Sequence, residues 1–152
     1  MLLTDLITPA RIRLPVEAHD KPGVLRELAT VLVAQCGGVY DDVLQSIEDR
    51  ERVLTTGIGF GVAIPHGKSP TLSELALVCG LSPHPIPYDS VDGEPVRIFF
   101  MLAGPESAAG SHVKVLSRIA RLVRRESVRD QLMNALTPAD FHRVIREAET
   151  WQ

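Results

Sequence analysis

The sequence contains few cysteines and no long apolar run. Its two cysteines, Cys36 and Cys79, stand in apolar surroundings without CxxC spacing, which is typical of reduced, buried thiols in a cytoplasmic protein rather than of a disulfide or a metal site. No apolar run approaches the roughly 20 residues of a membrane-spanning helix. The first residues, Met-Leu-Leu-Thr-Asp-Leu, also lack the basic start of a secretory signal. The sequence therefore predicts a cytoplasmic protein without direct membrane insertion.

A basic excess is also absent. The chain carries 16 Lys and Arg against 19 Asp and Glu, a formal net charge of −3 at pH 7, whereas proteins that bind nucleic acid usually carry a marked basic excess. We therefore expect no nucleic-acid partner. A Walker A lysine sequence, a GxSxG motif and a set of three or four closely spaced metal ligands are missing too. Their absence disfavours nucleotide chemistry, a serine hydrolase and a metal site, so that neither metal nor cofactor is expected.

The helical segments have recognisable starts and ends. Apolar residues at helical spacing follow Asp20, a candidate N-cap, and Gly37-Gly38 ends this first helix. The sequence Thr137-Pro138-Ala139-Asp140 combines an N-cap, a proline at the first helical position and an acidic third residue, and therefore begins the last helix. Further helices are expected at about 41–50, 111–124 and 126–135.

Apolar runs predict the strands. Two continuous runs, at about 74–81 and 95–103, are typical of strands covered on both faces, and a third strand is expected at about 61–65. Between the long runs, residues 82–88 are too rich in proline for a central strand and predict a loop or a sheet edge. Because helices stand before, between and after the apolar strands, the 152 residues predict a single α/β layered domain.

Residues 57–68 read Gly-Ile-Gly-Phe-Gly-Val-Ala-Ile-Pro-His-Gly-Lys and place one histidine, His66, at the end of an apolar strand. Pro65 fixes φ and removes a backbone donor, while Gly67 permits a tight turn or a close approach of another molecule. Open α/β sheets usually carry their chemistry at the C-terminal ends of strands. An imidazole there can act as a nucleophile, an acid–base group or a metal ligand.

Two other residues can assist His66. Arg50 stands at the C-terminal end of the second helix, where its guanidinium can bind phosphate or carboxylate oxygens, although the helix dipole alone also favours an arginine there. His112 follows Gly110-Ser111 at the start of a later helix. If Gly110 or Ser111 is the N-cap, His112 lies in the first turn, where free N–H groups can bind an anion. A histidine in a first turn can equally have no functional role. Together these groups suit a phosphoryl group better than a metal ion.

Three other histidines and a series of four arginines are predicted to lie at the surface. His19, His84 and His142 are expected at the surface. Four arginines recur at three- and four-residue steps, which is typical of a solvated helix face and otherwise of a surface that docks an acidic partner. They are Arg118, Arg121, Arg125 and Arg129.

Two segments resemble a known family. Arg50-Glu51 and residues 55–68 resemble the active-site block of the enzyme IIA components of the bacterial phosphoenolpyruvate-dependent phosphotransferase system, fructose/mannitol and nitrogen-regulatory type. Residues 112–120, His-Val-Lys-Val-Leu-Ser-Arg-Ile-Ala, are similar to that family's second histidine segment. The resemblance runs from Leu3 to about Glu147. It implies that residues 1–152 form one enzyme IIA type-2 domain, with a mixed sheet of about five strands flanked by helices.

The resemblance also implies roles for individual residues. His66 is expected to accept a phosphoryl group on a ring nitrogen from the histidine-containing phosphocarrier protein. His112 is expected to bind the phosphoryl oxygens and Arg50 to neutralise their charge. Thr55, Gly67 and Lys68 complete the expected phosphate-binding set. Phe60 departs from the family, because some relatives carry a small polar residue there, and it makes the rim of the site more apolar.

The resemblance leaves three functions to choose from. The leading one is a nitrogen-regulatory phosphocarrier whose phosphorylation state controls its binding to target proteins. The second is a sugar-specific enzyme IIA that passes the phosphoryl group to a cysteine of enzyme IIB. The third is an interaction module with a vestigial site. The target, the sugar and the oligomeric state stay open.

Overall fold

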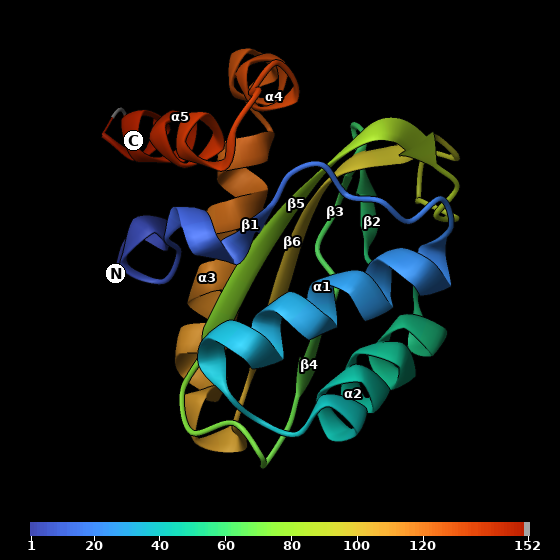
Figure 1. Ribbon diagram of the computed structural model, residues 1–152, viewed down its shortest axis with the longest axis vertical. Coiled ribbons are helices and arrows are strands. Elements are labelled where there is room, and N and C mark those ends of the chain that lie inside the picture. Colours follow the sequence, from blue (N-terminus) through green and yellow to red (C-terminus); the bar gives the residue numbers. More distant parts are fainter. Residues whose placement is uncertain (151–152) are drawn as a thin grey trace.

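The computed structural model describes residues 1–150, and within them the chain forms a six-stranded mixed sheet with helices on both faces. Figure 1 shows helices α1 (Lys21–Cys36) and α2 (Tyr40–Val53) on one face and α3 (Ala109–Val123) on the other. The chain then continues into α4 (Glu126–Met133) and α5 (Pro138–Glu149). None of the helices in the described part is both long and apolar enough to cross a membrane. The expected α/β layered architecture is confirmed.

Two long antiparallel strands form the centre of the sheet, β5 (Ala76–Ile86) and β6 (Val96–Gly104). The short strands are β1 (Ile12–Arg13), β2 (Gly57–Gly59), β3 (Val62–Ala63) and β4 (His66–Lys68). The order in the sheet is β1-β5-β6-β3-β2, and β4 also pairs with β6. β3 and β4 both run parallel to β6, one after the other, and β1 runs parallel to β5.

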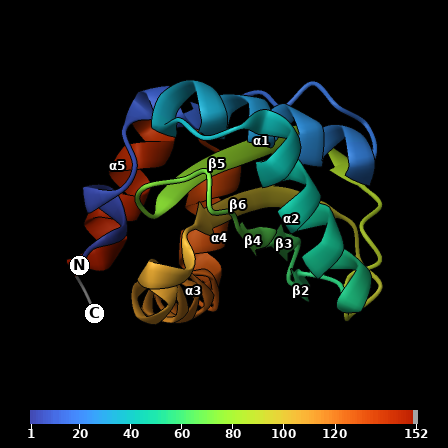
Figure 2. The ribbon, with the colours of Figure 1, turned by 90° about the horizontal axis from the view of Figure 1, so that it is seen from below.

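Both faces of β6 are buried, as its continuous apolar run predicts. Phe99 and Met101 pack with the residues of α1 and α2, while Phe100 and Leu102 pack on the side of α3 and α5. Figure 2 shows this layering edge-on, with β4 lying between α2 and α3. The short strand that begins with His66 is therefore held between two helices from opposite faces.

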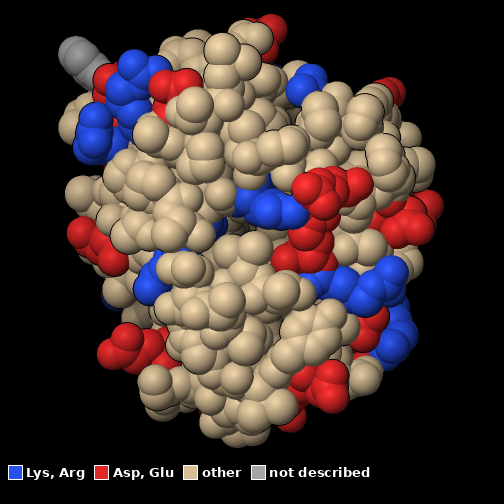
Figure 3. All heavy atoms as spheres, viewed as in Figure 1, with Lys and Arg blue, Asp and Glu red and all other residues tan. Residues whose placement is uncertain are grey.

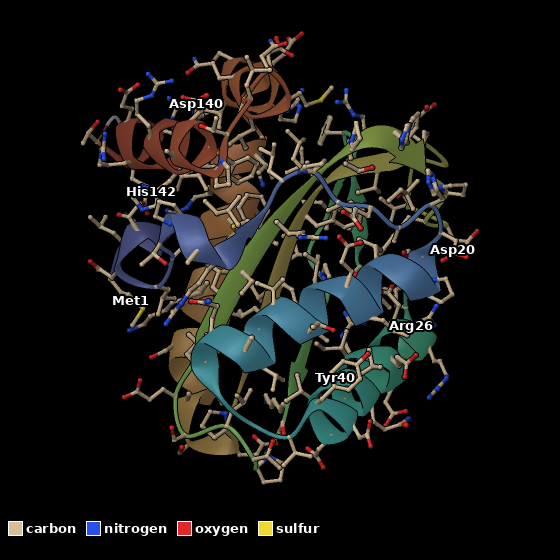
Figure 4. All side chains as sticks on the ribbon, in the orientation of Figure 1. Met1, Asp20, Arg26, Tyr40, Asp140 and His142 are labelled. Atoms are coloured by element: carbon tan, nitrogen blue, oxygen red, sulfur yellow. The ribbon has the colours of Figure 1, made fainter. Side chains whose placement is uncertain are left out.

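The two helix starts predicted with a side-chain cap, at Asp20 and Thr137, are confirmed. The Asp20 carboxylate accepts a hydrogen bond from the Gly23 N–H at 2.8 Å, and the Thr137 hydroxyl accepts one from the Asp140 N–H at 3.1 Å. Figure 4 labels Asp20 and Asp140 at the starts of α1 and α5. Each cap satisfies one of the N–H groups that a helix start leaves without an intrahelical partner.

The expected strand at 61–65 is reduced to β3, and after a break at residues 64–65 the separate strand β4 follows. Pro65 has no N–H to donate, and the Ile64 N–H donates to the Thr56 carbonyl at 3.0 Å, outside the ladder with β6. His66 therefore begins β4 rather than following a longer strand. The glycines before it form a β2–β3 hairpin, whose turn holds Phe60 and Gly61 in the left-handed region, with φ of 60° and 76°.

Residues 82–88 are predicted to form a loop or a sheet edge, and the edge is confirmed as far as Ile86, where β5 ends. Its pairing with β6 shifts register between Leu81 and Ile86. Pro83 and Pro85 lie in this bulged, exposed part, where a missing N–H removes no ladder bond. The β1 pairing ends at Gly80, so this part of β5 is an edge.

Candidate active site

His66 is held by its own strand and by a nearby carbonyl. As the first residue of β4 it pairs with Leu102 of β6, and its Nδ1 lies 2.7 Å from the Ile64 carbonyl oxygen. A carbonyl oxygen only accepts, so Nδ1 carries the proton and Nε2 keeps its lone pair. Burial lowers the pKa of His66 below its ordinary value, and the Arg50 charge adds to this effect, against the raising effects of the Ile64 carbonyl and of Glu51. The ring is therefore neutral, with Nε2 available as a nucleophile.

His112 meets His66 edge-on. The ring centroids are 5.6 Å apart, the ring planes are inclined by 65°, and His112 is 4% exposed. Burial lowers the pKa of His112 to about 4; the positive charge that His66 would carry when protonated and the charge of Lys68 add to this effect, against the raising effect of Glu106. Its buried Nδ1 has no hydrogen-bond partner among the described residues. A buried N–H without a partner costs more than an unused lone pair, so the proton of this neutral ring belongs on Nε2.

The start of α3 differs from the expected one. Ala108 is the N-cap, in place of Gly110 or Ser111, and a 3₁₀ helix over Glu106–Ala108 precedes it. The N–H groups of Ala108 and Ala109 donate to the carbonyls of Pro105 and Glu106. His112 is consequently the fourth residue of α3, and the expected contribution of free N–H groups from the first turn is not supported at these two positions.

Arg50 lies on the last turn of α2, beside His66. Its Nη1 donates to the Leu54 carbonyl at 2.8 Å, which fixes one arm of the guanidinium and satisfies a carbonyl at the helix end. The guanidinium keeps further N–H donors, enough for a bidentate contact with an anion. The position predicted from the sequence, at the C-terminal end of α2, is confirmed, and Arg50 lines the same hollow as His66.

Two adjoining hollows meet at His66 and Arg50. The larger, of about 580 Å³, lies between α2, β4 and α3; the smaller, of about 390 Å³, extends towards β2. Arg50, His66, Val113 and Leu116 line both. The larger is also lined by Ser46, Asp49, Gly67, Lys68, Ala109 and His112, and the smaller by Thr55, Thr56, Ile58, Ile64, Ser117 and Ala120. Residues from 46 to 120 thus converge on one site.

The expected phosphate-binding residues lie around this site with partners of their own. The Thr55 hydroxyl accepts from the Gly57 N–H at 3.1 Å and donates to the Tyr88 carbonyl at 3.3 Å. The Lys68 ammonium lies 3.3 Å from a Glu106 carboxylate oxygen, and both side chains reach the solvent. Their contacts with a phosphate stay predictions.

Gly67 has a packing role that the sequence did not indicate. A Cβ on Gly67 would stand 2.5 Å from Ser46 Oγ and 2.8 Å from the Ser46 carbonyl carbon. Only a glycine lets α2 approach β4 this closely, and the approach is what brings Arg50 beside His66.

Glu51 is the residue that sequence reasoning missed. Its side chain is buried, and its carboxylate accepts hydrogen bonds from the Thr56 N–H at 2.6 Å, from the Thr56 hydroxyl and from the Tyr88 hydroxyl at 2.8 Å. The Lys21 ammonium lies 3.2 Å away. The only sequence signal was its place beside Arg50.

Within residues 1–150 no group of three or more His, Cys, Asp or Glu side chains could hold a metal ion.

Three of the four arginines expected on a solvated face join helices instead. Arg118 donates to the buried Glu149 carboxylate at 2.9 Å, Arg125 to the Ala148 carbonyl at 3.0 Å, and Arg129 to the Val123 carbonyl at 2.8 Å. Arg121 is exposed. On the face drawn in Figure 3, Lys and Arg alternate with Asp and Glu and form no single basic patch.

The other histidines stand apart from the site. His19 and His84 are exposed, with ring centroids 4.9 Å apart. His142, labelled on α5 in Figure 4, is half-buried rather than at the surface, and its Nε2 lies 3.2 Å from the Ile7 carbonyl oxygen.

The chain is similar to known proteins in sequence and in fold. The family model "Phosphoenolpyruvate-dependent sugar phosphotransferase system, EIIA 2" matches residues 5–148. The chain belongs to this family. An EIIA 2 chain is a phosphoryl carrier of the phosphotransferase system, so the family expected from the sequence is confirmed.

Relatives of the EIIA 2 chain include regulatory and sugar-specific proteins. The nitrogen regulatory protein of Bradyrhizobium diazoefficiens is 38% identical over 132 residues, which cover 87% of this chain and 86% of that protein. The fructose-specific EIIABC component of Bacillus subtilis is 38% identical over 137 residues, which cover 89% of this chain but 21% of that larger protein. The crystal structure of the nitrogen regulatory protein IIA-Ntr from Neisseria meningitidis has a TM-score of 0.89 at 29% identity, over 94% of this chain and 98% of that one.

Proposed function

We propose that Nε2 of His66 accepts a phosphoryl group from a phosphohistidine of a histidine-containing phosphocarrier protein. The Nε2 lone pair forms the new N–P bond while the N–P bond to the donor breaks, and its electron pair stays on the donor ring. The observation that carries the proposal is the neutral His66 ring, with Nδ1 bound to the Ile64 carbonyl, at the meeting point of two hollows.

The groups around His66 suit the charge of the transferred phosphoryl group. Phosphoryl transfer depends on in-line positioning and on stabilising the equatorial oxygens. We assign the Nε2–H of His112 and the guanidinium of Arg50 to these oxygens, because both line the hollow beside His66. Lys68, Thr55 and the backbone at Gly67 extend the same set. Cationic and N–H donors can perform this function without a metal ion.

A regulatory output is favoured over sugar transport. Nitrogen regulatory proteins match this chain over most of both lengths at up to 38% identity. The fructose-specific relative of equal identity is a much larger protein, and the fructose-specific EIIA component of Haloferax volcanii, which matches over 98% of its own length, is 32% identical. Phosphorylation changes the charge at the rim by about −2, which alters binding to a target protein. The equal identity of the fructose-specific relative keeps transfer to an enzyme IIB cysteine as the second candidate. The free thiols of Cys36 and Cys79 support a cytoplasmic setting.

Intact-mass analysis tests the proposal. The chain is incubated with enzyme I, the histidine-containing phosphocarrier protein and phosphoenolpyruvate, next to His66→Ala and the exposed control His84→Ala. We expect an acid-labile gain of one phosphoryl group in the parent chain and in His84→Ala, and none in His66→Ala. No gain in the parent chain with a competent donor would instead indicate an interaction module with a vestigial site.

A further inference from the structure

A continuous series of hydrogen bonds joins Glu51 to His66. The Thr56 N–H donates to the Glu51 carboxylate at 2.6 Å, the Ile64 N–H donates to the Thr56 carbonyl at 3.0 Å, and His66 Nδ1 lies 2.7 Å from the Ile64 carbonyl oxygen. Each link fixes the position of the next backbone segment. Glu51 of α2 is thereby tied to the ring of His66 at the start of β4.

The same carboxylate holds two other segments. The Tyr88 hydroxyl, from the loop after β5, donates to it at 2.8 Å. The Lys21 ammonium, from the first turn of α1, lies 3.2 Å from it, 3.3 Å from the Tyr88 carbonyl oxygen and 4.4 Å from the centroid of the Tyr88 ring. Because Glu51 directly follows Arg50, the end of α2 that carries Arg50 is fixed at this junction.

Glu51 keeps its negative charge although it is buried. Burial favours the neutral acid, but the hydrogen bonds from Thr56 and Tyr88 and the charge of Lys21 together lower the pKa of Glu51 below its ordinary value. A charged carboxylate that accepts hydrogen bonds from Thr56 and Tyr88 and pairs with Lys21 is a strong, directional anchor. Its charge also acts on His66, in the direction opposite to that of Arg50.

We propose that Glu51 is the positioning residue of this site: a buried carboxylate that sets the guanidinium of Arg50 and the ring of His66 in one geometry by anchoring α2 to the backbone that supports His66. Glu51 lies outside the larger hollow and does not touch the transferred group. The proposal rests on the proposed function, in which His66 accepts the phosphoryl group and Arg50 binds it.

Glu51→Gln tests this positioning, and Glu149→Gln is a matched control. Glu149 is also buried and near a helix end; it accepts from the N–H groups of Leu3 and Thr4 and pairs with Arg118, away from the site. An amide at position 51 offers one oxygen to donors that now share two, and carries no charge. We expect Glu51→Gln to slow phosphoryl acceptance on the order of tenfold, the loss typical when the partner that orients a functional ligand is removed, whereas Glu149→Gln keeps the parent rate.

A histidine NMR titration gives a readout that a merely structural role would not move. The groups that face His66 are Asp49, Arg50 and Glu51 from α2, Lys68 from β4 and His112 from α3. Loss of the Glu51 charge removes a raising effect, so the pKa of His66 falls in Glu51→Gln and stays unchanged in Glu149→Gln. Parent-like transfer and titration in a folded Glu51→Gln would overturn the proposal.

Tyr88→Phe covers the case in which Glu51→Gln does not fold. It removes one hydrogen bond to Glu51 and keeps both the ring and the carboxylate. A reduced transfer rate in Tyr88→Phe supports the positioning role, and the parent rate overturns it. If the parent chain accepts no phosphoryl group at all, the proposed function fails, while the His66 titration still shows whether Glu51 acts on that ring.

Discussion

Each histidine of the site has one ring nitrogen whose state the fold decides. Nδ1 of His66 donates to the Ile64 carbonyl, and Nδ1 of His112 is buried without a partner among the described residues. The atoms that remain are complementary: a lone pair on Nε2 of His66 and an N–H on Nε2 of His112. The sequence predicted both histidines but not this division, because it depends on a carbonyl and on burial that only the tertiary fold supplies.

His112 should make stability depend on pH. The pKa of His112 is about 4 in the folded chain and about 6.5 in an unfolded one. As pH falls from 6.5 to 4, the unfolded chain gains a proton there that the folded chain does not, so the free energy of unfolding decreases. We expect the loss between pH 7.5 and pH 4.5 to be about 2 kcal/mol larger in the parent chain than in His112→Gln. Urea unfolding at both pH values measures it; equal losses would show that His112 titrates alike in both states.

At the scale of elements, the decisive contact is that of α2 with β4. It places Arg50 beside His66, and it depends on the absence of a side chain at Gly67. The long strands and the caps at Asp20 and Thr137 were predictable, because apolar runs and caps are local signals. The division into β3 and β4 was not, because it depends on the distant carbonyl that accepts from the Ile64 N–H.

Gly67→Ala should separate these elements. The new Cβ would meet the backbone of Ser46 and Ile47, which cannot rotate away as a side chain tip can. We expect a loss of about 1–3 kcal/mol in the free energy of unfolding, as for other overpacked sites, together with slower phosphoryl acceptance. Gly110→Ala is the control, because a Cβ there has open space on α3, and alanine favours a helix by about 1 kcal/mol over glycine. Urea unfolding of both variants distinguishes them, and a Gly67→Ala chain as stable as Gly110→Ala would contradict the packing argument.

At the scale of the whole molecule, two buried carboxylates join segments that are distant in sequence. Glu51 does so at the site, and Glu149 does so where α5 lies beside the N-terminal segment (Figure 1). The composition predicted neither, since each carboxylate is buried only because donors from separate elements converge on it. The two carboxylates have different roles. Glu51 fixes the geometry of the site, and Glu149 joins the N-terminal segment to α5.

Glu149→Ala should therefore lower stability without altering the site. The substitution leaves the Leu3 and Thr4 N–H groups and the half-buried Arg118 guanidinium without their acceptor. Removing one partner of a buried ion pair costs about 3–5 kcal/mol, and the partial exposure of Arg118 places the expected loss near the lower end. Urea unfolding followed by circular dichroism measures it, and intact-mass analysis under conditions where both chains are folded should show the same phosphoryl acceptance. Unchanged stability would mean that water replaces the carboxylate at no cost, and that the N-terminal segment is held by the apolar contacts of Leu3 and Ile7 alone.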